Sequence, residues 1–240
     1  MPILASVLIA AAILYLFRDR APEVGFHLGT ATLQVGKTKQ YASISAALAV
    51  ARDGDSIVVA PGIYSENVLL KSGVALISAK RGEAEIQSRG TALNAQTITG
   101  VRISGFRIGP DATNTLQIGV LTRDSALEID DSEIFGGSDA GVVIQGNSTV
   151  RLTKNLIHEN IKAGVRVESA SVPDMQGNHI CDNGVDIDPA SPLATDANVT
   201  GPCSGKKEVR KETSSPVKPA HTEKARPSGE SGTRKGRRNE

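Results

Sequence analysis

The chain has 240 residues, of which 39% are hydrophobic and only 3% aromatic, with two cysteines and a formal net charge of +1. This length suffices for one sizeable core, and the apolar content is too high for a wholly disordered chain. Two cysteines exclude a disulfide-dense miniprotein and a zinc-finger array. The shortage of aromatic residues argues against a surface that binds sugars or single-stranded nucleic acid by ring stacking.

The first 17 residues form an uncharged run rich in Ala and Leu. Its length lies between the apolar core of a signal peptide and a membrane-spanning helix of about 20 residues. Because no small-x-small cleavage site stands between Tyr15 and Arg20, we favour a transmembrane anchor over a signal segment for residues 1–20, with residues 21–39 as a linker. A buried core helix is the alternative. Basic residues usually flank the cytoplasmic end of a membrane span. Here they follow the run instead of preceding it, so the membrane orientation stays open.

A short helix and a strand are predicted next. Residues 41–51 are Ala-rich and amphipathic, and Ser43 is suited to be the N-cap of a helix. Residues 56–60 form an apolar strand, and Pro61 and Gly62 follow as a turn.

The central part of the chain repeats with a period of 23 residues. Equal phases of the repeat carry similar residues: Ser132, Asn155 and Asn178, and two residues later Ile134, Ile157 and Ile180. Short strands alternate apolar and polar residues, and no segment of helix length separates them. We therefore predict an all-β fold, a right-handed, single-stranded parallel β-helix of about six coils over residues 40–203. The short N-terminal helix would cap its first coil, and stacked Asn side chains would stabilise its turns.

The N-terminal part of this region resembles a known family. Residues 41–68 follow the pattern Tyr41-x-x-Ile44-x-x-Ala47-Leu48-x-x-Ala51-x-x-Gly54-Asp55-x-Ile57-x-Val59-x-Pro61-Gly62-x-Tyr64-x-Glu66-x-Val68. This pattern is similar to that of pectin-lyase-like right-handed β-helix proteins, including pectin methylesterases. The resemblance implies their fold, but it carries over no catalytic residue. No Gln-Asp pair is present, no Gly-His-Gly follows Asp130-Asp131, and Asp188-Pro189-Ala190 breaks the Asp-Pro-His-Asp run of alginate epimerases.

Residues of equal phase in stacked coils should be neighbours on the outer face. We expect Arg166 and Asp186 to share one column, and Glu168 and Asp188 the next. These four residues are the candidate catalytic residues, since paired carboxylates separate their pKa values. Glu168 and Asp188 are also candidate Ca²⁺ ligands, and calcium-dependent pectate lyases of this fold favour that interpretation. Alternatively, Arg166 neutralises the cluster as a surface salt-bridge ladder. Apart from Ca²⁺, no cofactor is expected.

Three further features have simpler interpretations. Glu128, Arg151 and Asp174 form a column of alternating charge, typical of ordinary cross-strand pairs. His158 is predicted to be a solvated turn residue, with a role as a general base as the alternative. Cys181 and Cys203 lie 22 residues apart, close to one coil. We therefore expect a disulfide that fixes the last coil and indicates an oxidising compartment.

Residues 204–240 contain 11 basic and 5 acidic residues and almost no large apolar residue. This composition predicts a disordered basic tail, either a solvated linker or a segment that attracts an anionic surface. Specific nucleic-acid binding is not expected, because no folded domain that recognises a nucleic-acid sequence accompanies the tail.

Three functions follow from these features. The first is a membrane-anchored, extracytoplasmic β-helix module in the periplasm or at the cell surface, held by residues 1–17. It would bind a polysaccharide or cell-envelope component, or act as a scaffold, without catalysis. The second is a polysaccharide lyase, hydrolase or esterase, which rests on the resemblance and the column of acidic residues. The third is the sensor domain of a larger membrane protein.

Overall fold

The computed structural model describes residues 30–112, 115–168, 172–189 and 197–203. The predicted anchor (residues 1–20) and the predicted tail (residues 204–240) therefore lie outside the described residues. Within the described part of the chain, no helix is long and apolar enough to cross a membrane.

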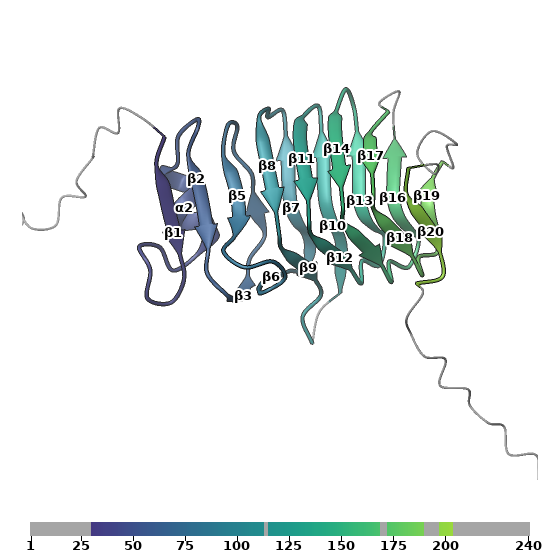
Figure 1. The fold of residues 1–240 in the computed structure, drawn as a ribbon, viewed down its shortest axis with the longest axis horizontal. Coiled ribbons are helices and arrows are strands. Elements are labelled where there is room, and N and C mark those ends of the chain that lie inside the picture. Colours follow the sequence, from purple (N-terminus) through teal and green to yellow (C-terminus); the bar gives the residue numbers. More distant parts are fainter. Residues whose placement is uncertain (1–29, 113–114, 169–171, 190–196, 204–240) are drawn as a thin grey trace, which may run out of the picture. The chain divides into compact units, whose positions relative to one another are not determined.

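The chain winds into a parallel β-helix, and successive strands join three sheets in turn (Figure 1). Sheet A contains β1 (Thr32–Val35), β2 (Ser56–Val59), β5 (Ala75–Ser78), β8 (Val101–Ser104), β11 (Ala126–Asp130), β14 (Thr149–Thr153) and β17 (Asp174–Gln176). Sheet B contains β3 (Gly62–Ser65), β6 (Ala84–Gln87), β9 (Arg107–Gly109), β12 (Glu133–Phe135), β15 (Leu156–His158), β18 (His179–Cys181) and β20 (Val199–Gly201). Sheet C contains β4 (Val68–Leu69), β7 (Gly90–Gln96), β10 (Leu116–Arg123), β13 (Ala140–Gln145), β16 (Ala163–Glu168) and β19 (Val185–Asp188).

The β-helix has about seven turns, one more than the sequence predicts. The additional strand is β1, which lies inside the segment expected to be a linker and pairs in parallel with β2. Leu33 and Val35 of β1 are buried in the core. The linker prediction was wrong for this segment because β1 precedes the first residue of the recognisable repeat, so no periodicity marks it.

The core is built from aliphatic side chains that stack from coil to coil. In sheet A, the parallel register places Ile57, Leu76, Ile103, Ile129 and Leu152 in one inward column, and all five are buried. Each such side chain contributes roughly 1.5–3 kcal/mol by leaving water. The period-two alternation of the strands therefore fixes which residues remain on the outer face.

Buried Asn side chains stabilise the turn between sheets A and B. The Asn155 Nδ2 group donates to the Ile129 carbonyl (2.8 Å) and to Asn178 Oδ1 (3.0 Å). Asn155 Oδ1 accepts the Ser132 N–H at 3.0 Å. The predicted stacking of these Asn side chains is confirmed. The left-handed residue of the turn is the preceding one, Lys154, with φ of 55°.

The predicted helix is present as α2 (Ile44–Val50), and it covers the first coils with Ile44, Ala47 and Leu48 buried. Ser43 Oγ accepts the Ala46 N–H as the predicted N-cap. Glu66 accepts the backbone N–H groups of Ile44 (2.8 Å) and Ser45 (2.9 Å) at the same helix end. The family-like pattern of residues 41–68 therefore has a structural role in this chain.

We predict that Asn155→Ala lowers the free energy of unfolding by about 2–4 kcal/mol, because it leaves buried peptide groups of two coils without partners. Chemical denaturation followed by circular dichroism would measure the change. Asn147→Ala is the control, since the exposed Asn147 side chain should change stability by less than about 0.5 kcal/mol. Equal stabilities of the two variants would contradict the prediction.

Candidate functional site

The four predicted site residues lie on or beside sheet C, in a different arrangement from the expected one. Arg166 is in register with Val143 on one side and with Asp188 on the other, whereas Glu168 pairs with Gln145. The predicted pairing of Glu168 with Asp188 was therefore wrong. The prediction assumed an offset of 20 residues between these strands, with Arg166 beside Asp186 and Glu168 beside Asp188. The loop 182–184 before β19 is only one residue shorter than the loop 159–162 of the previous coil, so the offset falls from 23 residues in sheet B to 22 here, and Ala163 aligns with Val185.

Arg166 is held between two carboxylates. Its Nη1 donates to Asp139 Oδ1 at 2.9 Å, and its Nε lies 2.8 Å from Glu168 Oε1. The hydrogen bond from Arg166 is the main cause that lowers the pKa of Asp139 to about 2, and Lys162 adds to it against the effect of burial. Gln145 Nε2 also donates to Glu168 at 2.7 Å. These contacts form a salt-bridge ladder. A ladder of this kind, in which Arg166 neutralises the carboxylates, is the alternative to a catalytic or Ca²⁺-binding site that the sequence left open.

The remaining two carboxylates do not join this cluster as a pair. Asp186 accepts the Gly201 N–H at 2.6 Å and the Asn183 side-chain amide at 3.0 Å, so it stabilises the last coil. Asp188 follows at the end of β19. Over the part of the chain that the structure describes, no three His, Cys, Asp or Glu side chains converge as a metal site.

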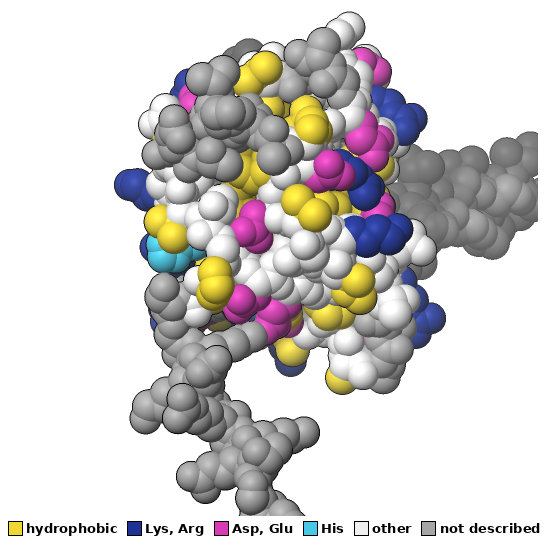
Figure 2. Space-filling model, turned by 90° about the vertical axis from the view of Figure 1, so that its right-hand side faces the viewer, with side chains coloured by type: hydrophobic (Ala, Val, Ile, Leu, Met, Phe, Trp, Pro, Cys, Tyr) yellow, Lys and Arg dark blue, Asp and Glu magenta, His cyan; other side chains and the backbone are white. Residues whose placement is uncertain are grey.

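The last coil carries the expected disulfide between Cys181 and Cys203, with Cα atoms 5.2 Å apart. Figure 2 views this end of the β-helix, where hydrophobic side chains are visible between acidic and basic ones. Val185 and Val199 of the last strands are 50% and 53% exposed. The disulfide therefore joins β18 to the segment after β20, where the stack of coils ends.

His158 lies in β15 rather than in a turn, and its side chain is only 15% exposed. Its Nε2 is 3.1 Å from Glu133 Oε1, and its ring stacks on Phe135 at 5.6 Å between centroids. Arg107 lies 5.0 Å from the Phe135 ring centroid and pairs with Glu133 at 2.9 Å. The prediction of a solvated turn residue was wrong, because the repeat places His158 on a strand directly beside Phe135.

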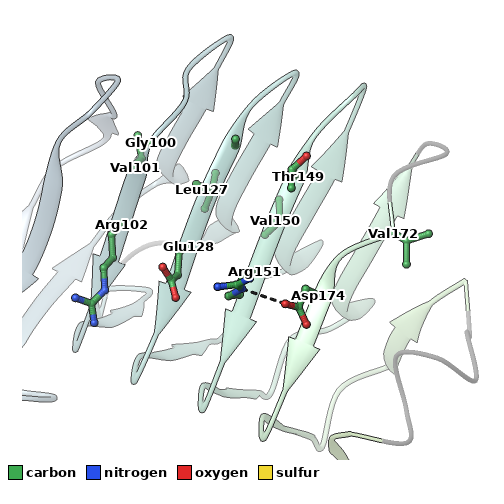
Figure 3. Close-up of a pocket in the computed structure, with 11 residues that line it drawn as sticks. Gly100, Val101, Arg102, Leu127, Glu128, Thr149, Val150, Arg151, Val172 and Asp174 are labelled. Carbon is green, nitrogen blue, oxygen red and sulfur yellow. Dashed lines mark hydrogen bonds and ion pairs between the residues drawn. The ribbon is translucent and has the colours of Figure 1, made fainter. Parts of the chain in front are cut away.

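A groove of about 440 Å³ follows the outer face of sheet A across β8, β11, β14 and β17 (Figure 3). Small residues, Gly100 and Ala126, line one side of it, and the exposed Val172 lines one end. Along the other side the register places four charged residues in one column: Arg102, Glu128, Arg151 and Asp174. The expected column of Glu128, Arg151 and Asp174 is confirmed.

Both arginines of the groove are paired with carboxylates. Arg102 donates from Nε and Nη2 to the two carboxylate oxygens of Asp130, at 2.8 and 2.9 Å. Ser104 Oγ also donates to Asp130 at 2.6 Å. Although burial alone would raise the pKa of Asp130, the hydrogen bonds from Arg102 and Ser104 hold it below its usual value. Arg151 donates from Nε to Asp174 at 3.0 Å.

Glu128 stands between these two arginines and is paired with neither. In the register it is the direct neighbour of Arg102 and of Arg151, and it lines the groove. It forms no hydrogen bond or ion pair with any other residue in the described ranges. Its interaction with Arg102 is through space: the pKa of Arg102 is raised chiefly by the hydrogen bond to Asp130, and the nearby charge of Glu128 adds to that effect. The groove therefore presents a carboxylate with both oxygens available, flanked by guanidinium groups that are held in place.

Sequence reasoning placed the charged column correctly but did not identify the groove. The missed residues are Arg102, Gly100 and Ala126. The sequence feature that could have indicated the groove is the alignment of Gly100-Val101 with Ala126-Leu127. This alignment makes two small residues neighbours on adjacent coils.

Comparisons with known proteins agree with this architecture. A family model described as "Right handed beta helix region" matches residues 60–200, which is more than half of the chain. The chain belongs to the right-handed β-helix family. No curated protein matches it in sequence. This β-helix protein therefore has the handedness and the fold class that the sequence predicts.

Solved structures that resemble this β-helix protein include an alginate lyase from Paenibacillus sp. str. FPU-7, with a TM-score of 0.50 and 18% identity over 68% of this chain and 59% of the lyase. The pectate lyase Pel9A has a TM-score of 0.46 and 11% identity, over 72% of this chain and 58% of that one. A pectin methylesterase in complex with a hexasaccharide has a TM-score of 0.44 and 12% identity, over 70% and 58%. At these identities the likeness shows the fold alone, and this chain spans about three fifths of each of these proteins.

We predict that Asp139→Asn destabilises the protein most above about pH 4 and least near pH 2. The pKa of Asp139 is lowered to about 2 from an ordinary 3.8, so its stabilising contribution is present above 3.8 and lost as the pH falls toward 2. Chemical denaturation of both proteins between about pH 6 and about pH 2 would measure the difference.

Glu83→Gln is the control for this experiment, because the Lys80–Glu83 pair is exposed and contributes little. A difference between wild type and Asp139→Asn that stays constant down to about pH 2 would refute the coupling of Asp139 to Arg166.

Proposed function

We propose that this β-helix protein is a carbohydrate-binding module of the cell envelope, which binds a polysaccharide chain in the groove on sheet A. One observation carries the proposal: Glu128 lies unpaired in an open groove between Arg102 and Arg151. Sugar hydroxyls both donate and accept hydrogen bonds, so they match a row in which acceptors and donors alternate. The groove crosses four coils, which suits an extended chain more than a small molecule.

A binding role is favoured over catalysis by how the carboxylates are engaged. Hydrolysis of a glycoside by carboxylates generally requires two carboxyl groups with separate roles. Asp130 and Asp174 are each paired with an arginine, which leaves Glu128 as the one unengaged carboxylate of the described groove. The likeness to an alginate lyase supports a polysaccharide ligand only at the level of the fold.

We place the module outside the cytoplasm, at the membrane. The Cys181–Cys203 disulfide supports an oxidising compartment such as the periplasm or the cell surface. The apolar run of residues 1–17 supports attachment to a membrane. The basic composition of residues 204–240 supports contact with an anionic surface.

We predict that Arg151→Gln weakens polysaccharide binding by about tenfold or more, because it removes charged donors from the centre of the groove. Affinity gel electrophoresis of the full-length chain against neutral and acidic polysaccharides would measure binding. Arg123→Gln is the matched control, since Arg123 is also held by one neighbouring side chain, Gln145, but lies on sheet C.

The same mixtures, analysed by mass spectrometry, test the enzyme alternative. We expect the polysaccharides to remain intact. Shortened or de-esterified products would favour a lyase, hydrolase or esterase, and absence of binding by the wild-type chain to every polysaccharide would refute the proposed function.

A further inference from the structure

The charges of the groove determine which class of glycan it can accept. The four charged residues in the column, two arginines and two acidic residues, sum to zero. Arg102 is in addition compensated by Asp130, which lies on the adjacent strand beyond Glu128. The groove therefore offers no excess of positive charge to an acidic polymer.

Hydrogen-bonding groups that remain available alternate along the column. Arg151 uses only its Nε to bind Asp174, and its Nη groups donate no hydrogen bond within the described ranges. Arg102 donates to Asp130 from Nε and Nη2, which leaves Nη1 available as a donor. Glu128 has both oxygens available, and its backbone lies one strand spacing, about 4.8 Å, from that of each arginine.

We infer that the groove selects an uncharged, hydroxyl-rich glycan and rejects a polyuronate. This inference rests on the proposed function and specifies its ligand. A hydroxyl can donate to Glu128 and accept from Arg102 or Arg151, so an uncharged chain satisfies every group of the column. The carboxylate of a uronate can only accept hydrogen bonds, and it would bring a second negative charge close to Glu128, where like charges at close range are costly.

The rest of the groove fits the same ligand class. Gly100 and Ala126 present no bulky side chain, so a sugar ring can approach the backbone of β8 and β11 closely. Val172, with 72% of its surface exposed, offers an apolar contact at one end of the groove. No aromatic side chain lines the described groove, so polar contacts rather than ring stacking must supply specificity.

A matched pair of ligands isolates the effect of charge. Hexamers of α-1,4-galacturonate, fully methyl-esterified or de-esterified, share one backbone and differ in their carboxylates. Neutral hexamers of β-1,4-linked glucose, mannose and xylose complete the set. In calorimetric titrations of the full-length chain, we expect at least one uncharged hexamer to bind about tenfold or more tightly than the de-esterified galacturonate. Mass spectrometry confirms that the esters remain intact.

Glu128→Gln tests the mechanism of selection. It keeps an acceptor oxygen and removes the negative charge, so we expect the affinity for de-esterified galacturonate to rise about fivefold or more. The affinity for the uncharged hexamer should stay within about threefold. Glu83→Gln is the control, because this exposed residue lies outside the groove and should change neither affinity.

The outcomes separate the inference from the proposed function. If de-esterified galacturonate binds more tightly than every uncharged hexamer, or if Glu128→Gln leaves the selectivity of the wild type unchanged, the inference is overturned while carbohydrate binding stands. If no hexamer binds to the wild-type chain, the inference and the proposed function both fail.

Discussion

The fold depends on satisfying the peptide groups that each coil buries where it turns from sheet A to sheet B. Asn155 and Asn178 meet this requirement because one amide side chain serves its own coil and the coils next to it. A buried peptide group without a partner would destabilise the protein by about 1–3 kcal/mol. Repeating the same side chain at the same phase therefore holds the coils in one register, and the aliphatic columns of the core follow from that register.

A fixed register also determines the chemistry of the outer faces. Sheet C brings Arg166 between Asp139 and Glu168, and every charge of that cluster is compensated. Sheet A, built by the same stacking, leaves Glu128 unpaired above a groove lined by small residues. The two faces have similar residue types, so the difference arises from which partners the register and the side-chain lengths allow.

The sequence was sufficient to predict features that repeat and insufficient for those that do not. The 23-residue period predicts the stacked Asn residues and the pairing of Arg151 with Asp174, because equal phases become neighbours. It fails at β1, which precedes the repeat, and in the last coil, where a shortened loop places Asp188 beside Arg166. The groove itself was not predictable from the period, since the two small residues that line it, Gly100 and Ala126, are 26 rather than 23 residues apart.

The direction of Arg102 explains why Glu128 remains available. The register makes Glu128 the direct neighbour of Arg102, yet the guanidinium reaches past it to Asp130, whose side chain is only 9% exposed. A carboxylate buried to this extent requires a paired cation and hydrogen bonds, whereas a more accessible carboxylate can be solvated by water. The buried Asp130 therefore engages Arg102, and Asp174 engages Arg151 on the other side. Glu128, between them, has no hydrogen bond or ion pair of its own in the described ranges, so a ligand that occupies the groove must supply donors to its carboxylate.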